Sequence, residues 1–298
     1  MDSKLNSKRS SQYDFKELCQ VFPDLEPFVF DNKQNHLTID FANLKAVKAL
    51  NKALLLSNFN IKYWDFPDTN LCPPIPGRLM YIDAISDLLL DSNIKKNIHV
   101  LDIGTGATCI YPLLGYSKYQ WNFTATDVDK TSLKNAQVII DKNKLNSCIS
   151  LRFQKDASHV FNGIIQPEDL FSVSMCNPPF YKSENEANQA TKRKLKGLGK
   201  LEKEVTRNFS GNSNELWYPG GEKAFLHNYL YQSSLYKNNC FWFTTLVSQK
   251  EHIKSMKTSL KKLNANKIKV LDISLGNKIA RVVAWTFLTQ AEQNSWNG

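Results

Sequence analysis

The feature that most constrains the fold of this chain is a regular alternation of short apolar runs and helical patterns from residue 81 onward. Seven apolar runs are predicted to be strands: residues 97–103, 121–127, 150–153, 170–176, 240–247, 268–273 and 282–288. Helical spacing of apolar residues separates most of these runs, which is typical of a parallel sheet with helices on both faces. The last two runs have no helix between them. We therefore expect an α/β fold whose seven-stranded, mostly parallel sheet ends in an antiparallel pair at one edge.

Two other segments set the predicted domain boundaries. Residues 1–78 are expected to form a small helical appendage, which ends at the proline-rich stretch Cys72–Gly77 and Arg78. Such a stretch cannot form the interior of a helix. Residues 79–298 are expected to form the main domain. Within it, residues 182–221 interrupt the alternation with a basic run and five glycines, which indicates a functional insertion.

The charge balance favours a polyanionic partner. The chain has 38 Lys and Arg residues against 28 Asp and Glu residues, a net charge of +10, and such an excess is typical of nucleic-acid binding. No apolar stretch approaches the roughly 18 residues of a membrane span, so no membrane partner is expected. The six cysteines are scattered without a C-x-x-C pair. This predicts neither a metal site nor a disulfide framework, and it favours a reducing compartment.

The run at 97–103 leads directly into the glycine turn Gly104-Thr105-Gly106. Glycines allow a tight turn and the close approach of a ligand, and ligands of doubly wound sheets lie at the carboxyl ends of the strands. Asp127 ends the next run, 23 residues beyond Gly104, where a carboxylate can accept hydrogen bonds from both ribose hydroxyls. Cys109 replaces the third glycine of the dinucleotide fingerprint, and Asp102 suits a positively charged ligand. We therefore predict S-adenosylmethionine rather than NAD at this site.

A second motif, Asn177-Pro178-Pro179-Phe180, follows the run at 170–176. An exocyclic amine or amide nitrogen is a poor nucleophile because its lone pair is delocalised. The side-chain oxygen of Asn177 and the carbonyl of Pro178 can accept its two N–H bonds, localise that lone pair and point it at a methyl group, while Pro179 restricts the backbone. Phe180 offers a flat face for an unstacked base. The motif therefore predicts methyl transfer to an amino or amide nitrogen, without distinguishing adenine from glutamine.

These motifs resemble the methyltransferase-like 16 family. The similarity covers the chain from about Tyr13 to Leu288, and it is carried by LDIGTGATCIYPLLG, ATDVD, MCNPPF, PGGE and PIPGRLMYI. The family contains adenine-N6 methyltransferases of U6 small nuclear RNA, related to a bacterial 23S ribosomal RNA adenine-N6 methyltransferase. The resemblance implies a Rossmann-like class I S-adenosylmethionine-dependent methyltransferase, with U6 as the RNA partner. It also implies a nuclear location, with the cytoplasm as the alternative.

The resemblance also implies roles for individual residues around the donor. Arg78 should reach the donor's carboxylate, and Gly104 and Thr108 should line its methionine end. The ribose is assigned to Asp127 and the adenine to Ser158, while Asn177 should contact both donor and target. Vertebrate members carry a C-terminal extension with an additional RNA-binding domain. No function of that extension is expected of a chain that ends at Gly298.

Basic clusters are predicted to contact RNA phosphates, one of them in the N-terminal appendage. Together these clusters comprise Lys4, Lys8, Arg9, Lys192, Arg193, Lys194, Lys196, Lys200, Lys254, Lys257, Lys261 and Lys262. RNA targets are usually single-stranded or bulged, with the target base splayed out, and Tyr181, Trp217 and Tyr218 are candidates for stacking on it. A monomer is expected.

Three functions from different classes compete. The leading hypothesis is an RNA adenine-N6 methyltransferase. A protein N5-glutamine methyltransferase uses a similar Asn-Pro-Pro turn, but it more often has Tyr at the position of Phe180 and has less need of a basic surface. A non-catalytic RNA-binding protein on the same fold is the third, and the intact Gly104, Asp127 and Asn177 argue against it.

Overall fold

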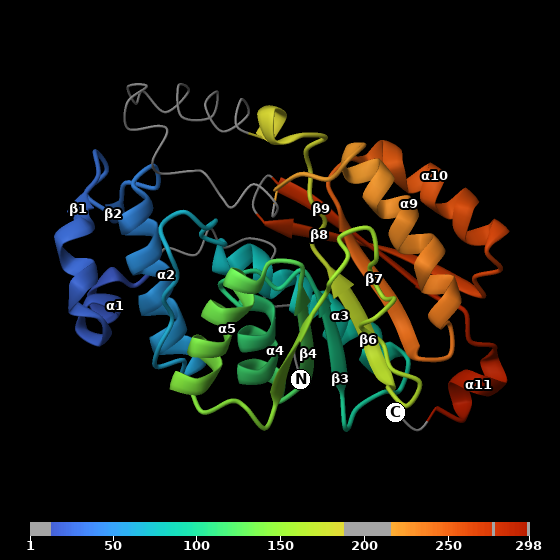
Figure 1. Cartoon of the computed structure of the whole chain (residues 1–298). Helices are drawn as coiled ribbons and strands as arrows, with labels where there is room; N and C mark the ends of the chain where they lie inside the picture. The colour runs from blue at the N-terminus through green and yellow to red at the C-terminus, as the bar shows by residue number, and fades with distance from the viewer. Residues whose placement is uncertain (1–12, 188–215, 276–277, 297–298) are drawn as a thin grey trace.

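The computed structural model describes residues 13–187, 216–275 and 278–296 (Figure 1). Its main sheet has seven strands in the order β5-β4-β3-β6-β7-β9-β8. These strands are β3 (His99–Ile103), β4 (Asn122–Asp127), β5 (Ile149–Phe153), β6 (Phe171–Cys176), β7 (Cys240–Val247), β8 (Lys267–Leu275) and β9 (Lys278–Thr286). The five strands from β3 to β7 are parallel, and β9 runs antiparallel to both β7 and β8. The seven-stranded sheet and its antiparallel edge pair are therefore confirmed.

The two faces of the sheet carry two separate hydrophobic clusters, because side chains alternate along each strand. On β7, Trp242 belongs to one cluster and the adjacent Phe243 to the other. The first cluster includes residues of α2 (Leu44–Phe59), α3 (Ile75–Asp91), α4 (Ile110–Tyr119) and α5 (Lys130–Lys142), and the second those of α9 (Gly221–Ser233) and α10 (Lys250–Lys262). The central strands β3, β6 and β7 are covered on both sides, which explains why nearly all of their residues are buried.

The N-terminal segment is more varied than the short helices expected from its sequence. It contains α1 (Phe15–Val21), the 3-10 helix η1 (Pro23–Phe28) and a hairpin of β1 (Val29–Asp31) and β2 (Leu37–Ile39), followed by α2. Figure 1 shows this segment packed at one end of the molecule, away from α9 and α10. Its buried residues share one cluster with the main sheet, so the two parts have a continuous core.

Helix α3 spans the boundary predicted at residue 78. It begins at Ile75, so Pro76 lies in its first turn, where a missing backbone N–H costs no hydrogen bond. Arg78 therefore lies inside this helix and not in a linker. Of the predicted insertion at 182–221, the structure describes residues 182–187 and 216–221. The clusters Lys4/Lys8/Arg9 and Lys192/Arg193/Lys194/Lys196/Lys200 lie outside the described residues.

The remaining described elements are the 3-10 helix η2 (Ser234–Tyr236) and α11 (Gln290–Asn294). Within the ranges that the structure describes, no helix combines the length and apolarity that crossing a membrane requires. The same ranges hold no group of three or more His, Cys, Asp or Glu side chains arranged to bind a metal.

Candidate functional site

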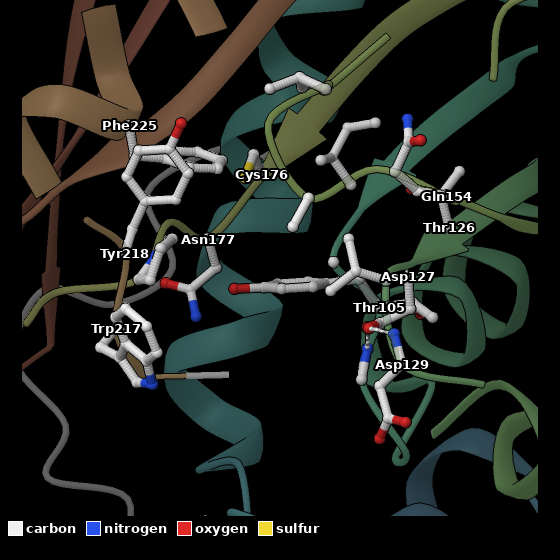
Figure 2. A pocket seen from close by; sticks show the side chains of 18 of the residues that line it. Thr105, Thr126, Asp127, Asp129, Gln154, Cys176, Asn177, Trp217, Tyr218 and Phe225 are labelled. Atoms are coloured by element: carbon white, nitrogen blue, oxygen red, sulfur yellow. Dashed lines mark hydrogen bonds between the residues drawn. The ribbon is translucent and has the colours of Figure 1, made fainter. Parts of the chain in front are cut away.

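A pocket of about 510 Å³ opens at the carboxyl ends of β3, β4 and β6, where the strand order reverses direction from β3. This is the position at which doubly wound sheets bind ligands. It brings together most of the predicted site residues: Arg78, Gly104, Thr108, Asp127, Ser158, Asn177 and Pro179. Figure 2 shows Thr105, Asp127 and Asp129 on one side of the pocket, with Asn177, Trp217 and Tyr218 facing them from the other.

The glycine turn after β3 has the backbone conformation that its sequence predicted. Gly104 has φ +78° and Gly106 has φ +66°, and a Cβ added to Gly104 would meet nothing within 4 Å. The Gly104 and Thr105 N–H groups both donate to the Thr126 carbonyl, at 2.9 Å each. Cys109, which stands where a dinucleotide fingerprint has glycine, has φ +50°. The turn therefore keeps the shape of the fingerprint and leaves open space beside Gly104.

The Asp127 side chain links this turn to the end of β4 through hydrogen bonds. Its Oδ2 accepts a hydrogen bond from the Gly106 N–H at 2.8 Å, and its Oδ1 accepts one from the Asp129 N–H at 2.9 Å. Each carboxylate oxygen has a second lone pair, so both can still accept from a ligand hydroxyl. Burial raises the pKa of Asp127 above its ordinary value, and the two backbone hydrogen bonds oppose that shift.

Asp102 lies on β3 directly behind the turn and is 1% exposed. Neither of its carboxylate oxygens has a hydrogen-bond partner among the described residues. The pKa of Asp102 is raised to about 7, chiefly by burial and also by the nearby Asp127, while the Thr105 hydroxyl and Arg78 oppose the shift. A buried carboxylate without a partner is costly in its ionised form, and a cationic ligand would relieve that cost.

The raised pKa of Asp102 predicts a pH-dependent stability. The pKa of Asp102 in the folded protein lies above its ordinary value of 3.8. The protonated side chain therefore makes its full contribution to the free energy of unfolding below pH 3.8, and this contribution is lost as the pH rises through about 7. Without ligand, Asp102→Asn should therefore be more stable than the wild type at pH 8, by up to roughly 4 kcal/mol. Urea unfolding from pH 5 to pH 8 measures the difference. Parallel pH profiles of the two proteins would contradict this account.

Arg78 and Tyr111 form a second polar corner of the pocket. The Arg78 guanidinium lies 5.6 Å from the centre of the Tyr111 ring, which is a cation–π distance. The Tyr111 hydroxyl is buried and has no hydrogen-bond partner among the described residues. Burial raises the pKa of Tyr111 to about 12, so its hydroxyl stays protonated. Arg78 supplies the positive charge that an anionic ligand group needs at this corner.

The Asn177–Phe180 segment leaves the end of β6 at the same edge of the sheet. Asn177 and Pro179 line the pocket, while Phe180 lies outside its lining and is 37% exposed. The Phe180 and Tyr181 N–H groups donate to the Leu216 carbonyl at 3.1 and 3.0 Å, and the Tyr218 N–H donates to the Tyr181 carbonyl at 2.9 Å. These bonds bring residues 216–218 against the motif, although 35 residues of the sequence separate the two segments.

The Trp217–Phe225 region forms an aromatic wall opposite the glycine turn. Trp217, Tyr218 and Phe225 line the pocket, and the rings of Tyr218 and Phe225 meet edge to face at 5.3 Å. In Figure 2, Trp217 and Tyr218 stand next to Asn177. Aromatic faces beside an amide acceptor are suited to holding a planar base. Tyr181 pairs with Trp217 through the backbone, so the three predicted aromatic residues lie in one region.

The loop after β5 supplies the remaining side of the pocket. Ser158 lines it, but the Ser158 hydroxyl donates to Asp156 Oδ1 at 2.7 Å. Gln154, which the sequence did not single out, lines the pocket and shapes this loop, since its Oε1 accepts from the Asp156 N–H at 3.0 Å. The signal for Gln154 is its place just after a predicted strand, like Asp127. Leu71, Tyr111 and Val128 also line the pocket and have no comparable signal.

The fold and the site together define a Rossmann-like methyltransferase. A family model described as RNA methyltransferase matches residues 4–289, and the chain belongs to this family. The chain is 47% identical over 295 residues to the ribosomal RNA large subunit methyltransferase F of Flavobacterium johnsoniae, covering 96% of this chain and 93% of that protein. The protein of the same name from Aeromonas salmonicida is 43% identical over 295 residues, covering 97% and 93% of the two chains.

Solved structures of human METTL16 are also similar to this chain in fold and in sequence. Its catalytic domain in complex with MAT2A 3'UTR hairpin 1 matches with a TM-score of 0.80 and 27% identity, covering 97% of this chain and 96% of that one. Its N-terminal domain in complex with SAH matches with a TM-score of 0.76 and 25% identity, covering 97% and 99%. The family resemblance and the Rossmann-like fold predicted from the sequence are thereby confirmed.

The nuclear location expected from the family resemblance is wrong. The relatives at 42–47% identity are bacterial proteins, and bacterial cells have no nucleus. The alternative location, the cytoplasm, agrees with these relatives. The error arose because the family resemblance includes both nuclear and bacterial members, and the motifs that carry it contain the predicted site residues and no targeting information.

Proposed function

We propose that this RNA methyltransferase transfers a methyl group from S-adenosylmethionine to the N6 amine of an adenine in large-subunit ribosomal RNA. The observation that carries the proposal is the position of Asn177, which lines the same pocket as Gly104 and Asp127. An acceptor for an amine N–H thus lies beside a site for a nucleoside. The names of the bacterial relatives support ribosomal RNA as the substrate. U6, the RNA that the family resemblance implies, is a nuclear RNA, so we propose ribosomal RNA in its place.

The residues of the pocket fit S-adenosylmethionine. Asp102 is buried behind the pocket lining and is not part of it, and its carboxylate suits the ammonium group at short range; Arg78, which lines the pocket, suits the carboxylate of the same methionine end. The lone pairs left on Asp127 suit the ribose hydroxyls. A pocket of about 510 Å³ is large enough for a nucleoside with its amino-acid side chain. When bound, S-adenosylmethionine supplies an electrophilic methyl group.

The chain's own residues then prepare the acceptor. Asn177 Oδ1 and the Pro178 carbonyl accept the two N–H bonds of the adenine amine, so its lone pair is localised and directed at the methyl carbon. Phe180 stacks on the base, and its exposure leaves its ring available for that contact. No side chain has to remove a proton before transfer, because the proton is acidic only once the nitrogen carries the methyl group.

The RNA surface includes α10. Lys254, Lys257, Lys261 and Lys262 are all exposed on this helix, while Met256 and Leu260 are buried against the core. Such a one-sided cationic face suits phosphate contacts. The basic clusters outside the described residues remain part of the proposal, as do residues 1–78 as an RNA-binding appendage. The monomeric state likewise stays a prediction.

Transfer of labelled methyl groups tests the function directly. The purified protein should label large-subunit ribosomal RNA from cells that lack this protein, and nuclease digestion should yield N6-methyladenosine as the labelled nucleoside. Ribosomal RNA from cells that contain the protein is the matched control, because its target adenine is already methylated. Label in total protein that survives ribonuclease would support the glutamine methyltransferase instead.

A further inference from the structure

The end of β6 is held differently from the rest of the strand. The register of β6 with β7 ends at the pair Ser174–Phe243, two residues before Cys176, whereas the register with β3 continues to Cys176. Beyond Ser174, side-chain hydroxyls reach the backbone of β6. The Cys176 N–H donates to the Tyr81 hydroxyl at 3.3 Å, and the Thr245 hydroxyl, which lies 3.1 Å from the Leu246 carbonyl, is also within 3.4 Å of the Cys176 carbonyl. Cys176 directly precedes Asn177.

The direction of the hydrogen bonds at Tyr81 follows from its neighbours. The Thr244 hydroxyl donates its proton to the Ser174 carbonyl at 2.8 Å. It can therefore only accept in its 2.8 Å contact with the Tyr81 hydroxyl, which means that Tyr81 donates. The oxygen of Tyr81 is then left to accept the Cys176 N–H. Tyr81 is fully buried, so no water can replace it in either role.

We propose that Tyr81 is a positioning residue for methyl transfer, because its hydroxyl fixes the end of β6 and with it the orientation of Asn177. This inference rests on the function proposed above. Tyr81 lies on α3, one turn after Arg78, and its ring meets the Tyr111 ring edge to face at 5.7 Å. One helix thus contributes to the donor pocket through Arg78 and to the acceptor motif through Tyr81.

The variant Tyr81→Phe distinguishes the role of the Tyr81 hydroxyl from the packing of its ring. The variant keeps the ring and its contact with Tyr111, so the dissociation constant of S-adenosylmethionine should stay within about twofold. Loss of the hydroxyl frees the Cys176 N–H, and kcat should fall about 10- to 100-fold, the range expected when a catalytic group is displaced by up to about an ångström. Hydrogen exchange of the Cys176 amide should become faster, which reports the lost bond independently of catalysis.

Tyr229→Phe is the matched control. Tyr229 is also fully buried, and its hydroxyl contacts Ser174 Oγ at 2.9 Å and the Thr244 carbonyl at 3.2 Å, but not Cys176. This variant should lose a comparable amount of stability while its kcat and the exchange of the Cys176 amide remain near wild type. Equal kcat values for the two variants would overturn the inference, and so would a fall in kcat matched by an equal fall in donor affinity.

A second variant covers the case in which Tyr81→Phe does not fold. Thr244→Val removes the acceptor that orients the Tyr81 hydroxyl, and it should lower kcat and accelerate exchange at Cys176 in the same direction. Unchanged kcat and exchange in this variant would overturn the inference. If the wild-type protein methylates no adenine in RNA, the proposed function fails instead, while the exchange experiment still tests the bond between Tyr81 and Cys176.

Discussion

Asn177→Ala is expected to lower kcat for RNA methylation by about 10³-fold, while the protein stays folded. The substitution removes one of the two acceptors proposed for the adenine amine, so the lone pair should be neither localised nor directed at the methyl group. Asn177 also borders the donor site, so a rise of a few-fold in the dissociation constant of S-adenosylmethionine is expected. Single-turnover transfer at saturating donor separates the two effects.

Two companion variants sharpen this result. Asn177→Asp keeps an oxygen that accepts from the amine, so it should retain much more activity than Asn177→Ala, at about a tenth of wild type. Asn239→Ala removes an asparagine that precedes the amino end of β7, at the edge of the sheet opposite the pocket, where its side chain donates to the Asp169 carbonyl at 2.9 Å. It should leave kcat unchanged. Comparable activity in Asn177→Ala and Asn177→Asp would show that the amide oxygen does not act as the acceptor.

Asp127→Ala is expected to weaken binding of S-adenosylmethionine by about 100-fold and to destabilise the protein by about 2–4 kcal/mol. Both effects have one origin, since the carboxylate that holds the Gly106 and Asp129 N–H groups is also the proposed ribose contact. Its removal leaves two backbone donors without a partner and removes the proposed acceptor for the ribose hydroxyls. Calorimetric titration and urea unfolding measure the two effects.

Asp129→Ala is the control for that experiment. The Asp129 side chain caps α5 by accepting from the Thr131 N–H at 2.9 Å and the Ser132 N–H at 3.2 Å, so its loss should cost about 1 kcal/mol. The backbone N–H that Asp127 holds is retained in this variant. Donor affinity should therefore change far less than in Asp127→Ala. An equal loss of affinity would place the ribose contact on Asp129.

The main sheet could be predicted because the local sequence indicates where its strands lie. Four of the five strands from β3 to β7 are mostly buried, β5 is half-buried, and each is set off by turn or helical sequence on both sides. The missing helix between β8 and β9 indicated their antiparallel pairing. The hairpin of β1 and β2 was missed because three-residue strands leave no periodicity. The start of α3 was missed because Pro76 suggested a linker, although proline is well tolerated in a first turn.

The residues of the candidate site also fall into two groups, one that the local sequence indicates and one that it does not. Gly104, Asp127 and Asn177 each follow a strand end, so a parallel sheet necessarily brings them to one edge. Tyr81 and Tyr111 take their places through the tertiary packing of α3 and α4, and nothing in their local sequence indicates it. Trp217 was predicted as a stacking candidate, and the pairing of residues 216–218 with the segment after Asn177 brings it to the pocket. Ser158 lies at the pocket as predicted, but its hydroxyl already donates to Asp156.

The Cys176 thiol has a consequence for the chemistry of the pocket that it lines. A thiolate beside a sulfonium donor would be methylated itself, since sulfur is a better nucleophile than an aromatic amine. Burial raises the pKa of Cys176 well above its ordinary value, and Asp102 raises it further, so the sulfur keeps its proton. A protonated thiol is a weak nucleophile. The enzyme can therefore hold a sulfur atom next to its acceptor motif without inactivating itself by self-alkylation.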